Sequence, residues 1–363
     1  MAITLNMLLK VMVQNKASDT HIRGDATVCL RINGAVTQIN SSTLTAKEVE
    51  DMVTPLLTKR LSAIFAEKHE VDFSVDGGPE LGRFRFNVFI QKNKTCVAIR
   101  HIPAKIPTFE ELRLPVESIK KLLLNERGLI LVTGITGSGK TSSLAAMIEY
   151  LNQKWESHII TIEDPIEFVY ADKKCIISQR EIGSDTMSFV DALRAAMRQD
   201  PDVILVGEMR DLETTQAAIT AAETGHLVFA TLHTTNAVQT LSRVVDLFPP
   251  YQQAQVRMQL SETIKGIISQ RLLPCTKGGR VPAVEVLCGT AHIKKMIAEN
   301  NLDSITQAIT KGGFYGMQSF NQSLVKLHKE GMAKLDDIIQ AATNPDDVLL
   351  AIKGIEQEID TKK

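Results

Sequence analysis

The residues best suited to chemistry lie in Gly134–Thr141, which matches the pattern G-x-x-x-x-G-K-[ST] in full. This segment follows an apolar run and precedes a helical pattern, Thr141–Leu151, which is the context that the pattern requires. Glycine-rich turns and helix N-termini hold phosphate oxygens with backbone N–H groups. We expect Lys140 to reach the β- and γ-phosphates, and the Thr141 hydroxyl to ligate Mg²⁺. The segment predicts a nucleoside-triphosphate site made of Gly134, Thr136, Gly137, Ser138, Gly139, Lys140, Thr141 and Ser142.

Carboxylates follow two other apolar runs that read as strands. Glu208 comes directly after Val203–Gly207, where the usual aspartate position is occupied by Gly207. The run His158–Ile162 is followed by three carboxylates: Glu163, Asp164 and Glu167. Such groups are candidates for supporting Mg²⁺ or orienting a water molecule, although an acidic surface turn is the alternative for the second set. A phosphate loop alone does not distinguish a kinase, a helicase, a GTPase and a motor.

Two histidines, His226 and His233, bracket the apolar run Leu227–Leu232. Their odd separation places them on opposite faces of an ideal strand, which argues against a shared metal. Taken in isolation, each is more often a hydrogen-bonded structural histidine than a functional one.

The elements that position these residues follow two different patterns. Residues 1–103 read as an α+β domain with strand-like runs, helical patterns around Ala46–Phe65 and a hairpin signal at Asn33-Gly34. We expect a sheet with helices on one face, preceded by an amphipathic helix that begins near Leu5. Prolines then mark a linker over residues 104–116. The expected strands of this domain are Val28–Ile32, Arg83–Ile90 and Thr95–His101.

From residue 117 to residue 363, helical segments alternate with runs that are apolar on both faces. This alternation predicts an α/β domain in which a parallel sheet lies between helices. The chain beyond about residue 290 reads as mostly helical, with helices at Ala291–Asn300 and Ser319–Glu330 and a polar tail from Leu335. The expected strands are Gly128–Thr133, His158–Ile162, Val203–Gly207 and Leu227–Leu232.

Composition excludes several classes of protein. The 363 residues carry a net charge of −1, which argues against a polybasic nucleic-acid or membrane binder. The five cysteines include no C-x-x-C pair, so neither a zinc ribbon nor a disulfide framework is expected. No apolar stretch approaches the length of a transmembrane helix, and the N-terminus lacks the features of a secretory signal.

The chemistry-bearing segments, taken together, resemble those of a known family. Four segments are similar to the Walker A motif, Asp box, Walker B motif and His box of the secretion and pilus motor ATPases: Gly134–Thr141, Ile162–Phe168, Val203–Asp211 and Thr224–Thr234. Ala17–Ile22 and Gly316–Gln318 extend the likeness to PilT/PilU-like type IV pilus retraction ATPases. Assembly ATPases of this superfamily carry a further N-terminal domain and a four-cysteine zinc motif. Only Cys275 and Cys288 lie in the relevant stretch, which favours the retraction branch.

This resemblance implies an N-terminal PAS-like module followed by a RecA-like phosphate-loop domain with C-terminal helices. It assigns the polarisation of the attacking water to Glu167 and the support of Mg²⁺ to Glu208, and these two roles are exchangeable. It assigns γ-phosphate sensing to His233 and a connection between the nucleotide and the neighbouring strand to His226. An arginine from the N-terminal module of the adjacent subunit completes the site, for which the candidates are Arg85 and Arg100.

The resemblance also implies a homohexamer that is cytoplasmic and peripheral at the inner membrane. Its implied partners are an inner-membrane pilus platform protein and, as a further candidate, a second retraction motor. Direct nucleic-acid binding is not expected. The signature Ala-Ile-Arg-Asn-Leu-Ile-Arg-Glu of retraction motors corresponds to His292–Glu299, where Lys294 and Ala298 replace its two arginines. An accessory motor or a paralogous secretion ATPase therefore remains an alternative, with a hexameric helicase and a nucleotide-gated binding subunit as more distant ones.

Overall fold

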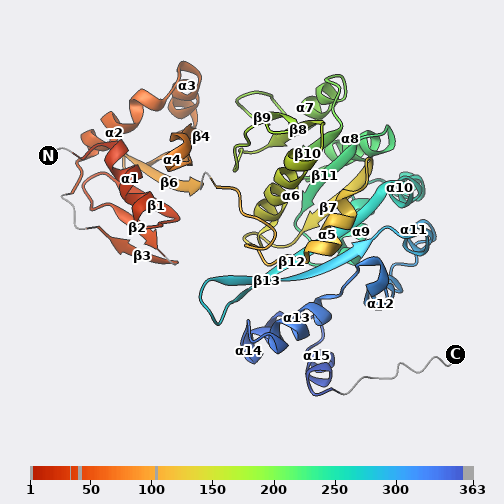
Figure 1. Ribbon diagram of the computed structural model, residues 1–363. Coiled ribbons are helices and arrows are strands. Elements are labelled where there is room, and N and C mark those ends of the chain that lie inside the picture. Colours follow the sequence, from red (N-terminus) through yellow and green to blue (C-terminus); the bar gives the residue numbers. More distant parts are fainter. Residues whose placement is uncertain (1–2, 33, 40–42, 103–104, 355–363) are drawn as a thin grey trace. The chain divides into compact units, whose positions relative to one another are not determined.

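The computed structural model describes residues 3–32, 34–39, 43–102 and 105–354 (Figure 1). The chain divides into two compact units, residues 1–106 with 167–169, and residues 107–166 with 170–363. The expected boundary at residues 103 and 104 lies outside the described residues. Phe109 and Leu114, from the stretch expected to be a linker, are buried in the core of the second unit.

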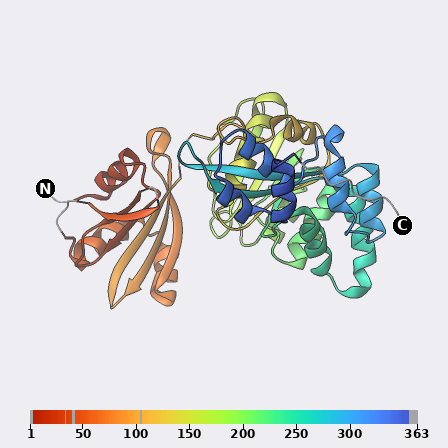
Figure 2. The same ribbon diagram turned by 90° about the horizontal axis from the view of Figure 1, so that it is seen from below.

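The first unit is an antiparallel sheet of order β3-β2-β1-β6-β5-β4 with helices packed on one face (Figure 2). One face of this sheet is buried more deeply than the other: Phe84, Phe86 and Val88 of β5 are buried, whereas the residues between them are only partly covered. A capping box of Thr45 and Glu48 starts α2. The strands are β1 (Asp19–Arg23), β2 (Cys29–Ile32), β3 (Ala35–Gln38), β4 (Glu70–Asp76), β5 (Arg83–Gln91) and β6 (Lys94–Ile102), and the helices are α1 (Leu5–Gln14), α2 (Ala46–Val53), η1 (Thr54–Leu56), α3 (Lys59–Lys68) and α4 (Gly78–Leu81).

The strands expected in this unit are confirmed to within a few residues. β2 and β3 pair antiparallel with Ile32 opposite Ala35, as the hairpin signal predicts, while Asn33 itself lies outside the described residues. The first helix buries Leu8, Leu9 and Met12. Among the described residues, no helix is both long enough and apolar enough to cross a membrane.

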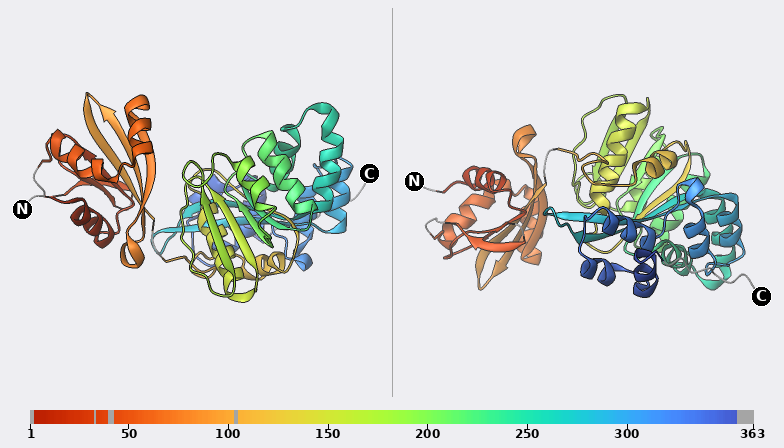
Figure 3. Two further views of the ribbon diagram at one scale, coloured as in Figure 1. Left: turned by 90° about the horizontal axis from the view of Figure 1, so that it is seen from above. Right: turned by 60° about the horizontal axis from the view of Figure 1, so that its bottom comes forward.

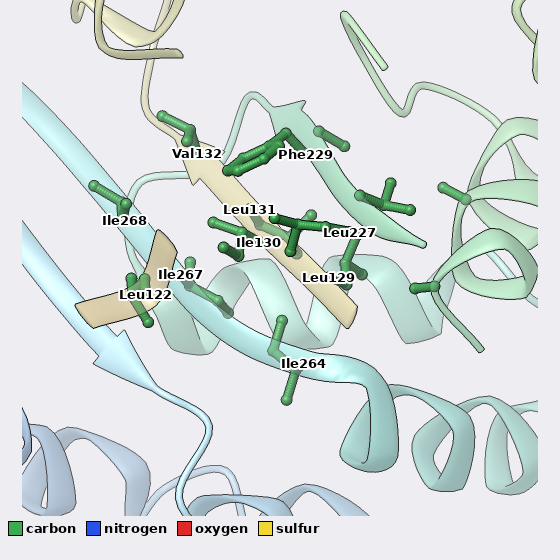
Figure 4. Close-up of a cluster of buried hydrophobic side chains, with 14 of the residues drawn as sticks. Leu122, Leu129, Ile130, Leu131, Val132, Leu227, Phe229, Ile264, Ile267 and Ile268 are labelled. Carbon is green, nitrogen blue, oxygen red and sulfur yellow. The ribbon is translucent and has the colours of Figure 1, made fainter. Parts of the chain in front are cut away.

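The second unit contains a seven-stranded sheet of order β13-β12-β7-β11-β10-β8-β9. All neighbouring pairs are parallel except β12 with β13. Every residue of β7 and β11 is buried, which requires cover on both faces of the sheet (Figure 4). The strands are β7 (Gly128–Thr133), β8 (His158–Glu163), β9 (Ile176–Glu181), β10 (Val203–Val206), β11 (Leu227–Leu232), β12 (Ile264–Pro274) and β13 (Arg280–Cys288).

Helices of this unit cover the sheet, and further helices follow its last strand, β13. Helices α13, α14 and α15 group beside β12 and β13 (Figure 3). On α11, Ile293, Met296 and Ile297 are buried, so this apolar stripe belongs to the core. The helices are α5 (Val116–Leu123), α6 (Lys140–Lys154), α7 (Phe189–Ala196), α8 (Leu212–Glu223), α9 (Ala237–Asp246), α10 (Pro250–Thr263), α11 (Ala291–Ala298), α12 (Ile305–Lys311), η2 (Gly313–Tyr315), α13 (Phe320–Lys329), α14 (Leu335–Ala341) and α15 (Pro345–Ile352).

Two expectations need correction here. The segment from Leu335 is not simply a polar tail, because α14 and α15 bury Ile338 and Val348 in a third apolar cluster. The strands β9, β12 and β13 were not expected from the sequence, and with them the sheet is mixed and wider than four strands.

Candidate nucleotide site

The phosphate loop connects the end of β7 to the start of α6. Gly134 has φ 146°, and a Cβ there would lie 2.4 Å from Ser138 Oγ and 2.5 Å from the Gln270 carbonyl oxygen, so only glycine fits. Gly139 precedes α6 with φ 95°. Lys140 is 8% exposed, and its Nζ donates to the carbonyl oxygens of Gly134 (2.7 Å) and Ile135 (3.1 Å). The loop is therefore folded with its lysine ammonium inside the curve of the backbone.

Strand β12 packs against the phosphate loop through Gln270, and one buried polar atom of each suits a polar ligand. Gln270 Nε2 donates to Ser143 Oγ at 2.7 Å, while Gln270 Oε1 and Ser138 Oγ have no hydrogen-bond partner among the described residues. A buried polar atom without a partner costs free energy unless a ligand or water satisfies it. This loop, its lysine and these orphaned atoms fit a bound triphosphate, and the Thr141 hydroxyl fits a Mg²⁺ ligand.

Glu208 and His233 lie at the ends of the neighbouring strands β10 and β11. The Gly207 N–H donates to the Ile162 carbonyl at 2.8 Å and the Met209 N–H to the Thr231 carbonyl at 3.0 Å, so the backbone on both sides of Glu208 is fixed. Glu208 Oε1 lies 3.3 Å from His233 Nε2, and its Oε2 lies 2.7 Å from Arg210 Nε.

The order of the strands puts these groups along one edge of the sheet. From the phosphate loop after β7, the edge continues to His233 after β11, to Glu208 after β10 and to the acidic segment after β8. Ligands of parallel sheets bind at this carboxyl edge. The structure thus gathers the phosphate loop, His233 and Glu208 at one edge of the sheet, within the second unit.

The acidic segment after β8 separates into different environments. Glu163 is buried and accepts hydrogen bonds from Thr161 Oγ1 (2.7 Å) and Gln179 Nε2 (3.3 Å). Asp164 is exposed, and Glu167 is half-buried. Burial, and next the charge of Glu163, raises the pKa of the nearby Tyr170 hydroxyl well above its ordinary value.

Glu181, at the end of β9, was missed by sequence reasoning. It is buried, lies in register with Glu163, and accepts a hydrogen bond from the Ile166 N–H at 3.2 Å. It braces the backbone of the acidic segment. Its strand has a mixed polar sequence with no apolar run, so the sequence offered little signal for it.

His226 lies at the other end of β11 from His233. Its Nδ1 is 2.9 Å from the Ala221 carbonyl oxygen, and its own carbonyl accepts from the Gly128 N–H at 2.9 Å. It therefore closes the turn after α8 and connects β11 with the start of β7, at the amino edge of the sheet.

The two candidate arginines lie in the first unit, directly opposite each other on β5 and β6. Arg85 Nε is 3.5 Å from Asp72 Oδ1, and Arg100 Nε is 2.9 Å from Asp19 Oδ1. Both guanidinium groups are partly exposed and paired with carboxylates of the same sheet.

A further arginine beside the loop was also missed. Arg280 Nη1, at the start of β13, lies 3.5 Å from the Gly137 carbonyl oxygen. The turn at Gly278-Gly279 between β12 and β13 places it there, and recognising this hairpin in the sequence would have drawn attention to it.

A phosphate loop on a mostly parallel sheet, with a glutamate and a histidine at the ends of neighbouring strands, defines a P-loop nucleotide-binding protein. The model of the type II/IV secretion system protein family matches residues 1–339, so the chain belongs to this family.

Two similar proteins are type IV pilus ATPases. The type IV pilus retraction ATPase PilT of Pseudomonas aeruginosa is 45% identical over 93% of this chain and 98% of its own length. The type IV pilus ATPase PilU of the same organism is 40% identical over 97% of this chain and 92% of its own. The crystal structure of the retraction motor PilT with bound ADP has a TM-score of 0.89 and covers 95% of this chain and 98% of that chain. The resemblance to retraction ATPases and the predicted α/β fold are confirmed.

Proposed function

We propose that this protein is a Mg²⁺-dependent motor ATPase that drives retraction of type IV pili. The observation that carries this proposal is its likeness to PilT along nearly the whole of both chains, at 45% identity. The geometry of the site supports it, because the phosphate loop, Glu208 and His233 occur together at one edge of the sheet.

The residues of this chain divide the chemistry among them. Lys140 and the backbone of the loop hold the β- and γ-phosphates, and the Thr141 hydroxyl, with support from Glu208, would hold a Mg²⁺ ion that would supply positive charge against the phosphates. Glu167 polarises the attacking water, with exchange of the two glutamate roles as the alternative. His233 is the γ-phosphate sensor in this proposal. Its ring lies within hydrogen-bonding distance of Glu208, so loss of the γ-phosphate would change the contacts of both side chains.

The active form in this proposal is a homohexamer in the cytoplasm, held at the inner membrane by a pilus platform protein. Arg85 or Arg100 of the neighbouring subunit stabilises charge on the transferred phosphoryl group, which is worth about three orders of magnitude in other P-loop enzymes. Differential affinity of the open and closed states for ATP converts hydrolysis into movement of the subunits. The domain limits expected from the sequence, 1–103 and 117–363, are part of this proposal.

The test is a deletion of the gene in its own host, complemented with Lys140→Ala or Glu167→Gln. We expect cells with excess pili that do not twitch, while the wild-type gene restores movement. Normal motility with either variant removes the retraction assignment, and cells without pili indicate an assembly motor. Phosphate release from the purified protein that rises strongly with single-stranded DNA would instead favour a helicase.

A second candidate is an accessory motor that works beside a primary one. The match to PilU covers 97% of this chain, and Lys294 and Ala298 stand where the retraction signature has arginines. Expression in hosts with and without a primary retraction motor separates the two: an accessory motor restores twitching only where the primary motor is present.

A further inference from the structure

Three exposed apolar side chains in the second unit lie away from the phosphate loop. Phe314 is 87%, Leu124 75% and Tyr315 54% exposed. The rings of Phe314 and Tyr315 meet edge to face with centroids 5.3 Å apart. Single exposed apolar residues are common on protein surfaces, whereas a rigid group of them marks a binding site.

Backbone contacts hold these residues, here called the aromatic patch, in place. The turn η2 is closed by hydrogen bonds from Tyr315 N–H to the Gly312 carbonyl (2.9 Å) and from Gly316 N–H to the Gly313 carbonyl (2.9 Å). A Cβ on Gly316 would lie 3.3 Å from Ser118 Oγ, so the turn rests on α5. The same Cβ would lie 3.6 Å from Lys121 Cδ, and Leu124, which caps the end of α5, follows Lys121 by three residues and therefore neighbours it on the helix surface.

Three cations, Arg127, Lys265 and Lys294, lie close together beside this patch and form what we call the cation cluster. Lys265 occupies a β-bulge between β12 and β7, and its side chain crosses Gly128, where a Cβ would lie 2.5 Å from Lys265 Cε. Burial, and next the charges of Lys294 and Arg127, lower the pKa of Lys265. Lys294 Nζ donates to the Glu262 carbonyl at 3.0 Å. Within the described part of the chain, none of the three forms an ion pair with a carboxylate.

Two short segments join the cluster to the patch. The first is the end of α5, where Leu124 precedes Arg127 by three residues. The second is Cys288–Thr290: the Cys288 thiol donates to the Tyr315 carbonyl (3.5 Å), the Gly289 N–H donates to the Lys265 carbonyl (2.9 Å), and Thr290 caps the helix α11 that carries Lys294. These contacts place the segment that carries the aromatic patch next to the segments that carry the cation cluster, so an apolar part and a basic part neighbour each other.

We propose that this surface docks an acidic, amphipathic segment of a partner protein. Apolar side chains of the segment cover Phe314, Tyr315 and Leu124, and its carboxylates lie among the three cations. Charge complementarity supports this occupant, because like charges held together cost free energy that an inserted carboxylate offsets. Lys265 is partly buried in the bulge, where a carboxylate on a side chain reaches it more easily than a flat layer of lipid headgroups.

The position of the surface leaves the nucleotide loop open. Arg127 and Lys265 lie at the amino end of β7 and the phosphate loop at its carboxyl end, so about 17 Å of strand separates them. Docking therefore does not cover the nucleotide, and the inference does not depend on which motor function the protein serves.

The test is fluorescence anisotropy of the full-length protein with a fluorescein-labelled peptide that alternates glutamate with leucine and phenylalanine. We expect saturable binding that weakens with salt and falls at least about tenfold for Phe314→Ser and for Arg127→Gln, roughly the loss of one desolvated contact. Lys265→Gln gives a second charge variant. Tyr251→Ser and Lys326→Glu are matched controls at exposed positions on α10 and α13, and they should retain wild-type affinity.

Several outcomes with other probes and with the variants would contradict the proposal. A peptide with glutamine in place of glutamate that binds equally, absence of saturable binding to the wild type, or equal binding to the patch variants would each overturn it. Co-sedimentation with phosphatidylglycerol vesicles that needs Phe314 and Arg127, without peptide binding, would identify a lipid surface instead. Phosphate release by Phe314→Ser should equal that of the wild type, which separates a docking defect from a failure of the proposed motor.

Discussion

His233 and Glu208 follow adjacent parallel strands, and their side chains meet with Nε2 3.3 Å from Oε1. Glu208 thus contacts a histidine on one side and Arg210 on the other, while its backbone is fixed by both neighbouring strands. The carboxylate is therefore more firmly held than the histidine, whose side chain is the more exposed of the two.

We predict that His233 and Glu208 act as a unit in hydrolysis. His233→Ala and Glu208→Gln should each lower the rate of phosphate release by about a hundredfold, and the double variant should lose little more than the worse single variant. Arg210→Gln is the comparison, because Arg210 contacts the same carboxylate from a more exposed position, and its effect should be small. Additive losses in the double variant would show that the two residues act independently.

Gly134 and Gly137 provide a matched pair within the phosphate loop. An alanine Cβ at position 134 would meet Ser138 Oγ and the Gln270 carbonyl, whereas at position 137, with φ 79°, it meets nothing within 4 Å. Gly137→Ala therefore carries only backbone strain of about 1–2 kcal/mol. We expect Gly134→Ala to reduce affinity for a fluorescent ATP analogue more than tenfold and Gly137→Ala distinctly less. Equal losses of affinity would mean that backbone strain limits ATP binding, and not the contact of the new Cβ with Ser138 and Gln270.

How much of this site the sequence can predict depends on how local each feature is. The phosphate loop and β7 were predictable because the motif and a strand buried on both faces are contiguous. The contact between Glu208 and His233 was not, because it depends on β10 lying beside β11 in the sheet.

The missed elements have equally specific causes. β12 carries Gln270 and Arg271 in its interior, which breaks the apolar run, and its partner β7 is distant in sequence. The helices α14 and α15 have only seven and eight residues, and each buries a single residue completely, so neither is long enough to show a clear apolar period.

Glu285 gives a prediction about stability and pH. It is buried and accepts from the Ala237 N–H at 2.8 Å; burial raises its pKa, against the opposing effects of that bond and of Arg271. The folded state then binds the proton more tightly than the unfolded one, so the stabilisation is complete below the unfolded pKa of about 4.3 and is lost as pH rises through the higher folded value. Glu285→Gln avoids this loss, because its amide oxygen can still accept from Ala237.

The melting temperature of Glu285→Gln relative to the wild type should therefore increase between pH 5 and pH 8. Scanning fluorimetry in buffers of equal ionic strength measures it. A difference that stays constant over this range would indicate that the carboxyl group titrates alike in both states.

Cys275 and Cys288 are each 8% exposed, yet their surroundings act on the thiol in opposite directions. A backbone hydrogen bond from Lys277, and next the Arg113 guanidinium at 3.0 Å from Sγ, lowers the pKa of Cys275. Burial raises the pKa of Cys288 to about 11. Because the thiolate is the nucleophile, we expect iodoacetamide at pH 8 to alkylate Cys275 at least about tenfold faster, as followed by peptide mass spectrometry. Arg113→Gln should narrow this ratio by slowing Cys275 alone; a ratio unchanged by that substitution would show that the Arg113 guanidinium does not activate the Cys275 thiol.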